Sequence, residues 1–285
     1  MKLAHFSHDG TSRLGVVVDD HVNDLAASAP DLPTDPIAFL EAGAAALDAA
    51  RAATDANPAW LPLADVQLLA PVPRPGKLVA IALNYRDHIE ETNAKEPEFP
   101  TFFNKQSTCV VGPGDGVEKP HVSDWVDYEG ELGVVIGTRC RTVSAADALS
   151  VVAGYTIVND VTVRDWQLKA PTMTIGKSFD THGPIGPWIV TTDELPDPQS
   201  LGIRTFVNGE QLQDGTTKDM IFDVAAQIET LSTAMTLEPG DVIATGTPAG
   251  VGIVRKPPVF LKVGDTVRVE IDGIGALENP VVAQA

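Results

Sequence analysis

The sequence has little cysteine, few basic residues and no long apolar run. Its two cysteines, Cys109 and Cys140, form no CxxC motif in 285 residues, which argues against a disulfide framework and against a cysteine-ligated metal. Lys and Arg number 20 against 39 Asp and Glu, a formal net charge of −19. Such a chain repels nucleic acid phosphates and anionic membrane surfaces, so we expect neither partner. No run of about 18 apolar residues and no leader-like N-terminal stretch occurs, so a cytoplasmic location is the default expectation.

The remaining composition is that of a folded, strand-rich protein. Apolar residues make up 44% and charged residues 21% of the chain, which is close to globular averages. The 24 glycines and 22 prolines indicate many turns and few long helices. A chain of this length is long enough for one large domain, or for a main domain with a smaller one attached. We therefore expect a β-rich α+β fold.

Residues 1–70 are predicted to form a small accessory domain, a β-meander followed by a helix. Turn-forming pairs at Asp9-Gly10 and Asp19-Asp20 separate three strand-like pieces. Asp35 is placed to cap a helix over Pro36 to about Ala53. The expected strands are 2–6, 14–18 and 21–25.

Residues 71–285 are predicted to form the main domain. The proline-rich stretch 57–75 reads as a connector, and Lys77–Leu83 is a nearly continuous apolar run typical of a strand buried on both faces. Short helices are expected near 145–152 and 221–234. Further strands are expected at 132–136, 155–158, 203–207, 242–244 and 267–271.

The pair Glu129 and Glu131 is the sharpest local feature. Side chains two apart in a strand share one face, so the two carboxylates repel unless a cation lies between them. A solvated edge strand would also carry alternating carboxylates. The apolar run 132–136 that follows indicates instead that the strand enters a core and carries the pair toward a covered site.

A third carboxylate, Asp160, closes the apolar stretch 154–160. Strand ends are well placed to face a common cleft. Three carboxylates without cysteine or a His-x-x-x-His helix favour a hard cation in oxygen coordination, Mg²⁺ or Mn²⁺, over Zn²⁺.

His88 and Glu91 form a candidate general-base pair. If the segment after Leu83 is helical, the two lie at i and i+3 on one face, where the carboxylate can orient the imidazole and raise its basicity. The alternative is an exposed acidic helix on which His88 merely titrates.

Two later segments could bind an anion. Lys177, between Gly176 and Ser178, imitates the end of a phosphate-binding loop, but Pro171 stands where that loop begins with glycine, so nucleotide binding is not expected. Lys177 could instead meet a substrate carboxylate or an enolate oxygen, or be a surface lysine. The glycine-rich stretch 245–252 suits a carboxylate, or is a tight connection.

From about Lys77 to Asn279 the chain resembles the fumarylacetoacetate hydrolase family. The ordered set of motifs is specific, although each motif alone is weak. The motifs are Asn84-Tyr85-x-Asp87-His88, Asp127-Tyr128-Glu129-x-Glu131-Leu132, Asn159-Asp160-Val161-Thr162-x-Arg164-Asp165-x-Gln167, Gly176-Lys177-Ser178-Phe179, Asn208-Gly209-Glu210, Leu237-Glu238-Pro239-Gly240-Asp241 and Thr245-Gly246-Thr247-Pro248.

The resemblance implies a mixed β-sandwich or roll, usually dimeric, with Mg²⁺ or Mn²⁺ bound by Glu129, Glu131 and Asp160. It implies that His88 and Glu91, on a segment that orders over substrate, activate a water molecule. It places Arg164, Gln167, Lys177 and Thr247 at positions that contact substrate or support the site. Larger members use a further aspartate upstream of the histidine, where this chain has Asn84-Tyr85. Three protein carboxylates are therefore expected, with water or substrate completing the coordination.

This site chemistry suits a 2-oxo acid substrate. Breaking a bond beside the oxo group leaves an enolate that the cation and Lys177 would stabilise. The leading hypothesis is hydrolysis of a C–C bond in an acylpyruvate or other 2,4-dioxo acid, with His88 as the base. Decarboxylation of an oxaloacetate-like acid, or isomerisation of a 2-hydroxy-dienoic diacid, is the close alternative. A non-catalytic protein that binds a metal or a small acid would not need His88 and Glu91.

Overall fold

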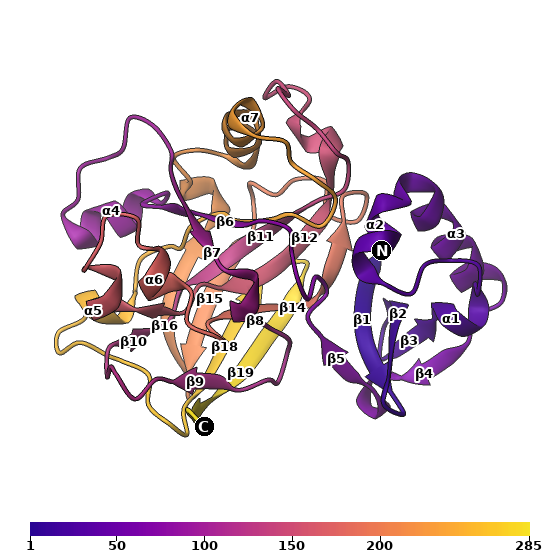
Figure 1. Cartoon of the computed structure of the whole chain (residues 1–285), viewed down its shortest axis with the longest axis horizontal. Helices are drawn as coiled ribbons and strands as arrows, with labels where there is room; N and C mark the ends of the chain where they lie inside the picture. Colours follow the sequence, from indigo (N-terminus) through magenta and orange to yellow (C-terminus); the bar gives the residue numbers. More distant parts are fainter.

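The computed structural model describes residues 1–285, which form two packed β-sheets and a small third one (Figure 1). The larger sheet has twelve strands, and two of them lie off its main path: β5 (Gln67–Leu69) pairs with β1, and β8 (Val110–Val111) pairs with β14. The main path runs β4 (Trp60–Pro62), β3 (His21–Asp24), β2 (Thr11–Val18), β1 (Lys2–His8), β14 (Gly183–Thr191), β12 (Val152–Asn159), β11 (Gly130–Ile136), β17 (Val242–Ala244), β6 (Leu78–Ala82) and β7 (Thr101–Lys105).

The second sheet has five strands and packs against the central part of the first. Its order is β16 (Glu210–Thr216), β15 (Gly202–Val207), β18 (Thr266–Ile271), β19 (Gly275–Ala283) and β9 (Val117–Lys119). A two-stranded ribbon joins β10 (Val126–Asp127) to β13 (Thr162–Val163). The β17–β6 pair is parallel, whereas β11 pairs antiparallel with both of its neighbours. This is the strand-rich mixed α+β sandwich that the sequence predicts.

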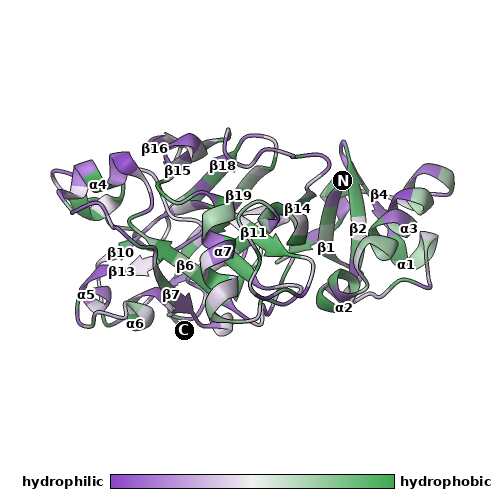
Figure 2. Ribbon diagram, turned by 90° about the horizontal axis from the view of Figure 1, so that it is seen from above, coloured by the Kyte–Doolittle hydropathy of each residue, from purple (hydrophilic) through white to green (hydrophobic).

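The main core lies between the two sheets. Leu132 and Ile157 of the large sheet and Ile203 and Val269 of the small sheet belong to one buried apolar cluster. The central strands β6 and β11 are largely hydrophobic in Figure 2, because both of their faces are covered. The predicted buried strand at Lys77–Leu83 is β6, and the other strands predicted for the main domain are also present.

The N-terminal residues extend the large sheet. β1 to β3 form the predicted meander, and β1 then pairs with β14 through Lys2 and Leu3, which lie opposite Val190 and Ile189. Leu3 and Ile189 also share a second buried cluster. Hydrogen bonds and apolar packing therefore join this region to the rest of the molecule.

Several predictions of local structure need correction. The single helix expected from Pro36 is two helices, α2 (Pro36–Glu41) and α3 (Gly43–Ala56), because Gly43 has φ +68 and interrupts the helix. Asp35 caps α2 as expected, accepting from Ala38 N. The expected connector contains β4 and β5, which pair with strands far away in sequence. The helix expected at 145–152 is only a 3₁₀ turn at Ala148–Val151.

The remaining helices are short, and most lie in the larger part of the molecule, away from the N-terminal strands (Figure 1). Asp24 caps α1 by accepting from Ala26 N, so Leu25 begins a helix and does not close the preceding strand. None of the helices is long and apolar enough to cross a membrane. The remaining helices are α1 (Leu25–Ser28), α4 (Arg86–Thr92), α5 (Arg164–Gln167), α6 (Thr174–Lys177) and α7 (Val224–Ala234). The two cysteines, Cys109 and Cys140, are both free thiols.

Candidate active site

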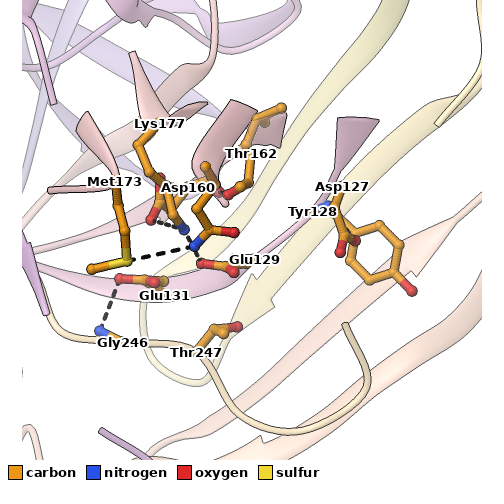
Figure 3. A network of polar contacts seen from close by, with 12 residues as sticks. Asp127, Tyr128, Glu129, Glu131, Asp160, Thr162, Met173, Lys177, Gly246 and Thr247 are labelled. Carbon is orange, nitrogen blue, oxygen red and sulfur yellow. Dashed lines mark hydrogen bonds and ion pairs between the residues drawn. The ribbon is translucent and has the colours of Figure 1, made fainter. Parts of the chain in front are cut away.

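Three buried carboxylates meet where β11 begins and β12 ends. Glu129 precedes β11, Glu131 is its second residue, and Asp160 follows β12. The antiparallel register sets Gly130 opposite Asn159, which brings these strand ends together. One oxygen from each carboxylate lies within 4.8 Å of the others, and all three side chains point toward one another in Figure 3.

Lys177, at the end of α6, lies between two of these carboxylates. Its Nζ is 2.6 Å from Glu129 Oε2 and 2.7 Å from Asp160 Oδ2 (Figure 3). Burial favours the neutral amine, but the two carboxylates outweigh burial and raise the pKa of Lys177. Because an ammonium has three N–H donors, one donor remains for another acceptor. Lys177 is buried and engaged with the cluster, so it is not a surface lysine.

Arg164, the first residue of α5, supports Glu129 from the other side. Its Nη1 lies 2.7 Å from Glu129 Oε1, and its Nε donates to Asp127 Oδ2 at 2.8 Å. Burial raises the pKa of Glu129, but Lys177 and Arg164 outweigh this and lower it to about 2. Gln167 accepts from Arg164 Nη1 at 3.1 Å. Glu129 is thus held ionised between two cations.

Glu131 is the one carboxylate of the three that makes no ion pair. It accepts a hydrogen bond from Gly246 N at 2.8 Å (Figure 3). Burial, together with repulsion from Asp160 and Glu129, raises the pKa of Glu131 well above its ordinary value. A divalent cation among the three oxygens would remove this repulsion, and carboxylate oxygens are the ligands that Mg²⁺ and Mn²⁺ prefer. The residues present therefore fit such an ion.

His88 and Glu91 lie on α4 and make the contact that helical spacing predicts. His88 Nδ1 is 2.6 Å from Glu91 Oε1, and Gly250 N donates to Glu91 Oε2 at 2.8 Å. Gly250 has φ +108, and a Cβ atom there would collide with the carbonyl oxygen of Leu212. Assigning the proton to Nδ1, as the carboxylate favours, leaves Nε2 as the basic nitrogen.

The hydroxyl of Thr247 is already engaged. It donates to Gly130 O at 3.0 Å and accepts from Gln213 Nε2 at 2.8 Å. Gln213 also accepts from Gly130 N at 3.0 Å, so one buried amide ties β16 to β11 and to the turn that contains Thr247. This network fixes the position of Thr247 at the wall of the site.

Seven of the nine predicted site residues line one cavity of about 520 Å³, and Asp160 and Glu91 lie just behind its wall; the seven are His88, Glu129, Glu131, Arg164, Gln167, Lys177 and Thr247. This volume suits a small molecule. The polar part of the lining consists of these residues with Thr92 and Thr101, and the rest of the lining is apolar. The apolar lining residues are Ile81, Ala82, Leu83, Phe103, Leu168, Ala170, Pro171, Met173, Val251 and Ile253.

Sequence reasoning missed Lys105, the last residue of β7. Its Nζ lies 2.6 Å from Asp160 Oδ1 and also donates to the carbonyl oxygens of Lys177 and Val161. The side chain is fully buried. The sequence did contain a sign that Lys105 is buried. Side chains alternate between the two faces of a strand, so in Phe103-Asn104-Lys105 the lysine lies on the same face as a buried phenylalanine.

Asp127 was also given no role from sequence. It accepts from Arg164 and from the backbone N–H groups of Gly252 and Ile253, at 2.7 and 3.0 Å. His182, which lies near Lys177 in sequence, is not part of the site. It is buried, stacks on Phe179 and hydrogen-bonds to the carbonyl oxygen of Glu118.

Comparison with known families gives two matches that together span most of the chain. The model for the fumarylacetoacetate (FAA) hydrolase C-terminal domain matches residues 77–282. The model described as Rv2993c-like, N-terminal, matches residues 1–71.

Individual proteins resemble the chain over almost their whole length. Oxaloacetate tautomerase fahd2, mitochondrial, of Xenopus laevis is 46% identical over 288 residues, 99% of this chain and 90% of that protein. The structure of fumarylacetoacetate hydrolase from Exiguobacterium antarcticum has a TM-score of 0.88 and 40% identity, covering 100% of both chains. That of maleylpyruvate hydrolase from Sphingobium sp. SYK-6, in complex with manganese and pyruvate, has a TM-score of 0.82 and 35% identity, again covering 100% of both.

Proposed function

The chain belongs to the fumarylacetoacetate hydrolase family, and from this premise we propose that it is a divalent-metal-dependent hydrolase of acylpyruvates or related 2,4-dioxo acids. The proposal rests on one observation. The hydrogen-bonded pair of His88 and Glu91 presents its imidazole to the same cavity as the carboxylates Glu129 and Glu131. A general base and a metal-ligand cluster in one cavity are the parts that metal-assisted hydrolysis requires.

Glu129, Glu131 and Asp160 would hold Mg²⁺ or Mn²⁺. When bound, the ion supplies positive charge that stabilises the oxygen of an enolate. The manganese and pyruvate in the related maleylpyruvate hydrolase support this assignment. Lys105, Lys177 and Arg164 keep the ligands in place, since each of these cations contacts at least one of them.

His88 performs the proton transfers. Nε2 takes a proton from water, and the water oxygen forms a bond to the acyl carbonyl carbon of the substrate. The C–C bond between that carbon and the adjacent methylene breaks, and its electron pair remains with the pyruvate fragment as an enolate. The imidazolium then returns the proton to the enolate carbon, which gives pyruvate and a carboxylic acid. Glu91 keeps Nδ1 protonated and stabilises the transient imidazolium charge.

The remaining wall residues would bind the substrate. Arg164, Gln167 and the free N–H of Lys177 face the cavity beside the carboxylates, where the carboxylate of a 2-oxo acid would lie. Thr247 borders the same space. The apolar wall accommodates the acyl tail. A homodimer and a cytoplasmic location stay predictions from sequence.

Tautomerisation or isomerisation of a 2-oxo diacid is the second candidate, with decarboxylation as a related reaction. The Xenopus relative, 46% identical over 99% of the chain, is named an oxaloacetate tautomerase. That reaction needs the same enolate and the same base, but no water. A protein that only binds a metal or a small acid would have no use for the His88–Glu91 pair.

A substrate panel distinguishes these functions. Purified protein with Mg²⁺ or Mn²⁺ is incubated with acylpyruvates, oxaloacetate and 2-hydroxy-dienoic diacids, and the products are identified by mass and absorbance. Release of pyruvate with a carboxylic acid establishes C–C hydrolysis. Interconversion of enol and oxo forms at unchanged mass, without release of pyruvate, establishes tautomerase activity. Loss of CO₂ establishes decarboxylase activity.

A further inference from the structure

The turn from Gly246 to Ile253 binds four acidic side chains through its backbone N–H groups. Two of these side chains lie on α4, and the other two belong to the carboxylate cluster and its support. The bonds are Gly246 N to Glu131 (2.8 Å), Ala249 N to Asp87 (3.1 Å), Gly250 N to Glu91 (2.8 Å), and Gly252 N and Ile253 N to Asp127 (2.7 and 3.0 Å). One turn therefore sets the distance between α4 and the carboxylates.

Helix α4 has few other attachments. It has seven residues, of which only His88 and Ile89 are buried. So short a helix does not hold its own conformation in water, and its orientation depends on what it is fastened to. The backbone just before it is fixed, because Tyr85 pairs with Met220. Beyond that point, Asp87 and Glu91 are the residues whose side chains hydrogen-bond α4 to the turn.

Asp87 and Glu91 lie four residues apart, on one face of the helix. If Glu91 alone accepted a hydrogen bond from the turn, the helix could rotate about that bond. The two bonds donated by the adjacent N–H groups of Ala249 and Gly250 prevent this rotation. The other oxygen of Asp87 accepts from His88 N at 2.7 Å. Asp87 thus binds both the turn and the backbone of the residue that carries the imidazole, yet it does not line the cavity.

We propose that Asp87 is a positioning residue, which acts with Glu91 to hold the imidazole of His88 in one orientation toward the carboxylate cluster. It touches no reacting atom and acts only through His88. The inference rests on the role proposed above for His88. Loss of Asp87 therefore slows the proton transfer and leaves metal binding unchanged.

The test compares Asp87→Ala and the gentler Asp87→Asn with Glu90→Ala, a control at an exposed residue of the same helix. We expect kcat to fall about tenfold or more in Asp87→Ala, because small displacements of a catalytic group are costly, with little change in KM or in Mn²⁺ affinity. Asp87→Asn keeps an oxygen acceptor and should fall between Asp87→Ala and the wild type. Glu90→Ala should match the wild type.

A double-mutant cycle separates positioning from a general structural effect. If Asp87 acts through His88, adding Asp87→Ala to a His88→Ala protein costs nothing further in rate. If Asp87→Ala lowers the rate of the His88→Ala protein by the same factor as it lowers that of the wild type, the proposal is overturned. It is also overturned if kcat of both Asp87 variants stays within about twofold of the wild-type value. Loss of Mn²⁺ affinity parallel to the loss of rate also contradicts it.

Hydrogen exchange gives a reading that does not depend on turnover. The backbone amides of α4 should exchange faster in both Asp87 variants than in wild type, while those of β11 remain protected. If the wild type turns over no member of the substrate panel, the proposed function fails, yet this measurement still decides whether Asp87 fastens α4. Unchanged exchange in α4 overturns the positioning role.

Discussion

The Nζ atom of Lys105 lies 2.6 Å from Oδ1 of Asp160, and neither side chain is exposed. The two residues are 55 positions apart. Lys105 also donates to the backbone carbonyl of Lys177, whose own Nζ contacts the second oxygen of Asp160. Asp160 is thus held by one lysine on each oxygen.

Lys105→Met should destabilise the metal-free protein. Removing one partner of a buried, hydrogen-bonded ion pair leaves charge and carbonyl oxygens unsatisfied, which costs about 3 kcal/mol of unfolding free energy. Urea denaturation measures this. Lys95→Met is the control, since the pair of Lys95 with Glu98 is exposed and its loss should not change the midpoint. Equal midpoints for all three proteins would contradict the prediction.

Glu131→Gln should have opposite effects on stability and on metal binding. In the metal-free protein it removes a buried carboxylate that Asp160 and Glu129 repel, so the unfolding free energy stays the same or rises. Mn²⁺ affinity should fall by about 100-fold or more, because a direct ligand is lost. Titration with Mn²⁺ followed by electron paramagnetic resonance measures this, with the exposed Glu210→Gln as control. Unchanged affinity would remove Glu131 from the ligand set.

His182 should make stability depend on pH. Burial lowers its pKa from 6.5 to about 4. Below pH 6.5 the His182 side chain takes up a proton in the unfolded chain but not in the folded protein, which favours unfolding. The stabilisation that the neutral, buried His182 provides is therefore fully present above pH 6.5 and is lost as the pH falls toward 4. The difference in unfolding free energy between wild type and His182→Phe should therefore fall by about 2 kcal/mol from pH 7 to pH 5. A difference independent of pH would show that His182 titrates normally.

Glu91→Gln should reduce kcat by about 100-fold or more while Mn²⁺ binds with wild-type affinity. The neutral side-chain amide of glutamine does not stabilise the imidazolium of His88 as the Glu91 carboxylate does, and it does not keep the proton on Nδ1 of the neutral imidazole. Glu90→Gln on the same helix provides the matched control. The steady-state rate and the metal titration are measured on the same preparations. A full rate in Glu91→Gln would mean that His88 does not work as a base with this partner.

Local patterns were sufficient for the central strands and for the pair of carboxylates at the start of β11, whereas the approach of Asp160 to that pair depends on the pairing of β11 with β12. The apolar run at β6 and the i, i+2 spacing of Glu129 and Glu131 are properties of neighbouring residues, and the structure shows both. The i, i+3 contact of His88 with Glu91 follows equally from helical spacing. These features required no knowledge of how distant segments meet.

Features that depend on distant pairing were not accessible in this way. Lys105 sits in a strand-like segment that reads as half exposed, and only the meeting of β7 with the end of β12 buries it against Asp160. Likewise the carboxylate of Asp127 accepts hydrogen bonds from Arg164, 37 residues away, and from the backbone N–H of Gly252 in a distant turn. The strands β4 and β5 were missed because their partners, β3 and β1, lie far back in the sequence.

The role of His88 is tested most directly by the product stoichiometry of an acylpyruvate reaction, with wild type and His88→Ala loaded with the same Mn²⁺. The wild type should form one pyruvate and one carboxylic acid for each substrate consumed. His88→Ala should bind Mn²⁺ equally and lose about 100-fold or more in rate. Substrate consumed without pyruvate, or a full rate in His88→Ala, would show that His88 does not activate water for C–C cleavage.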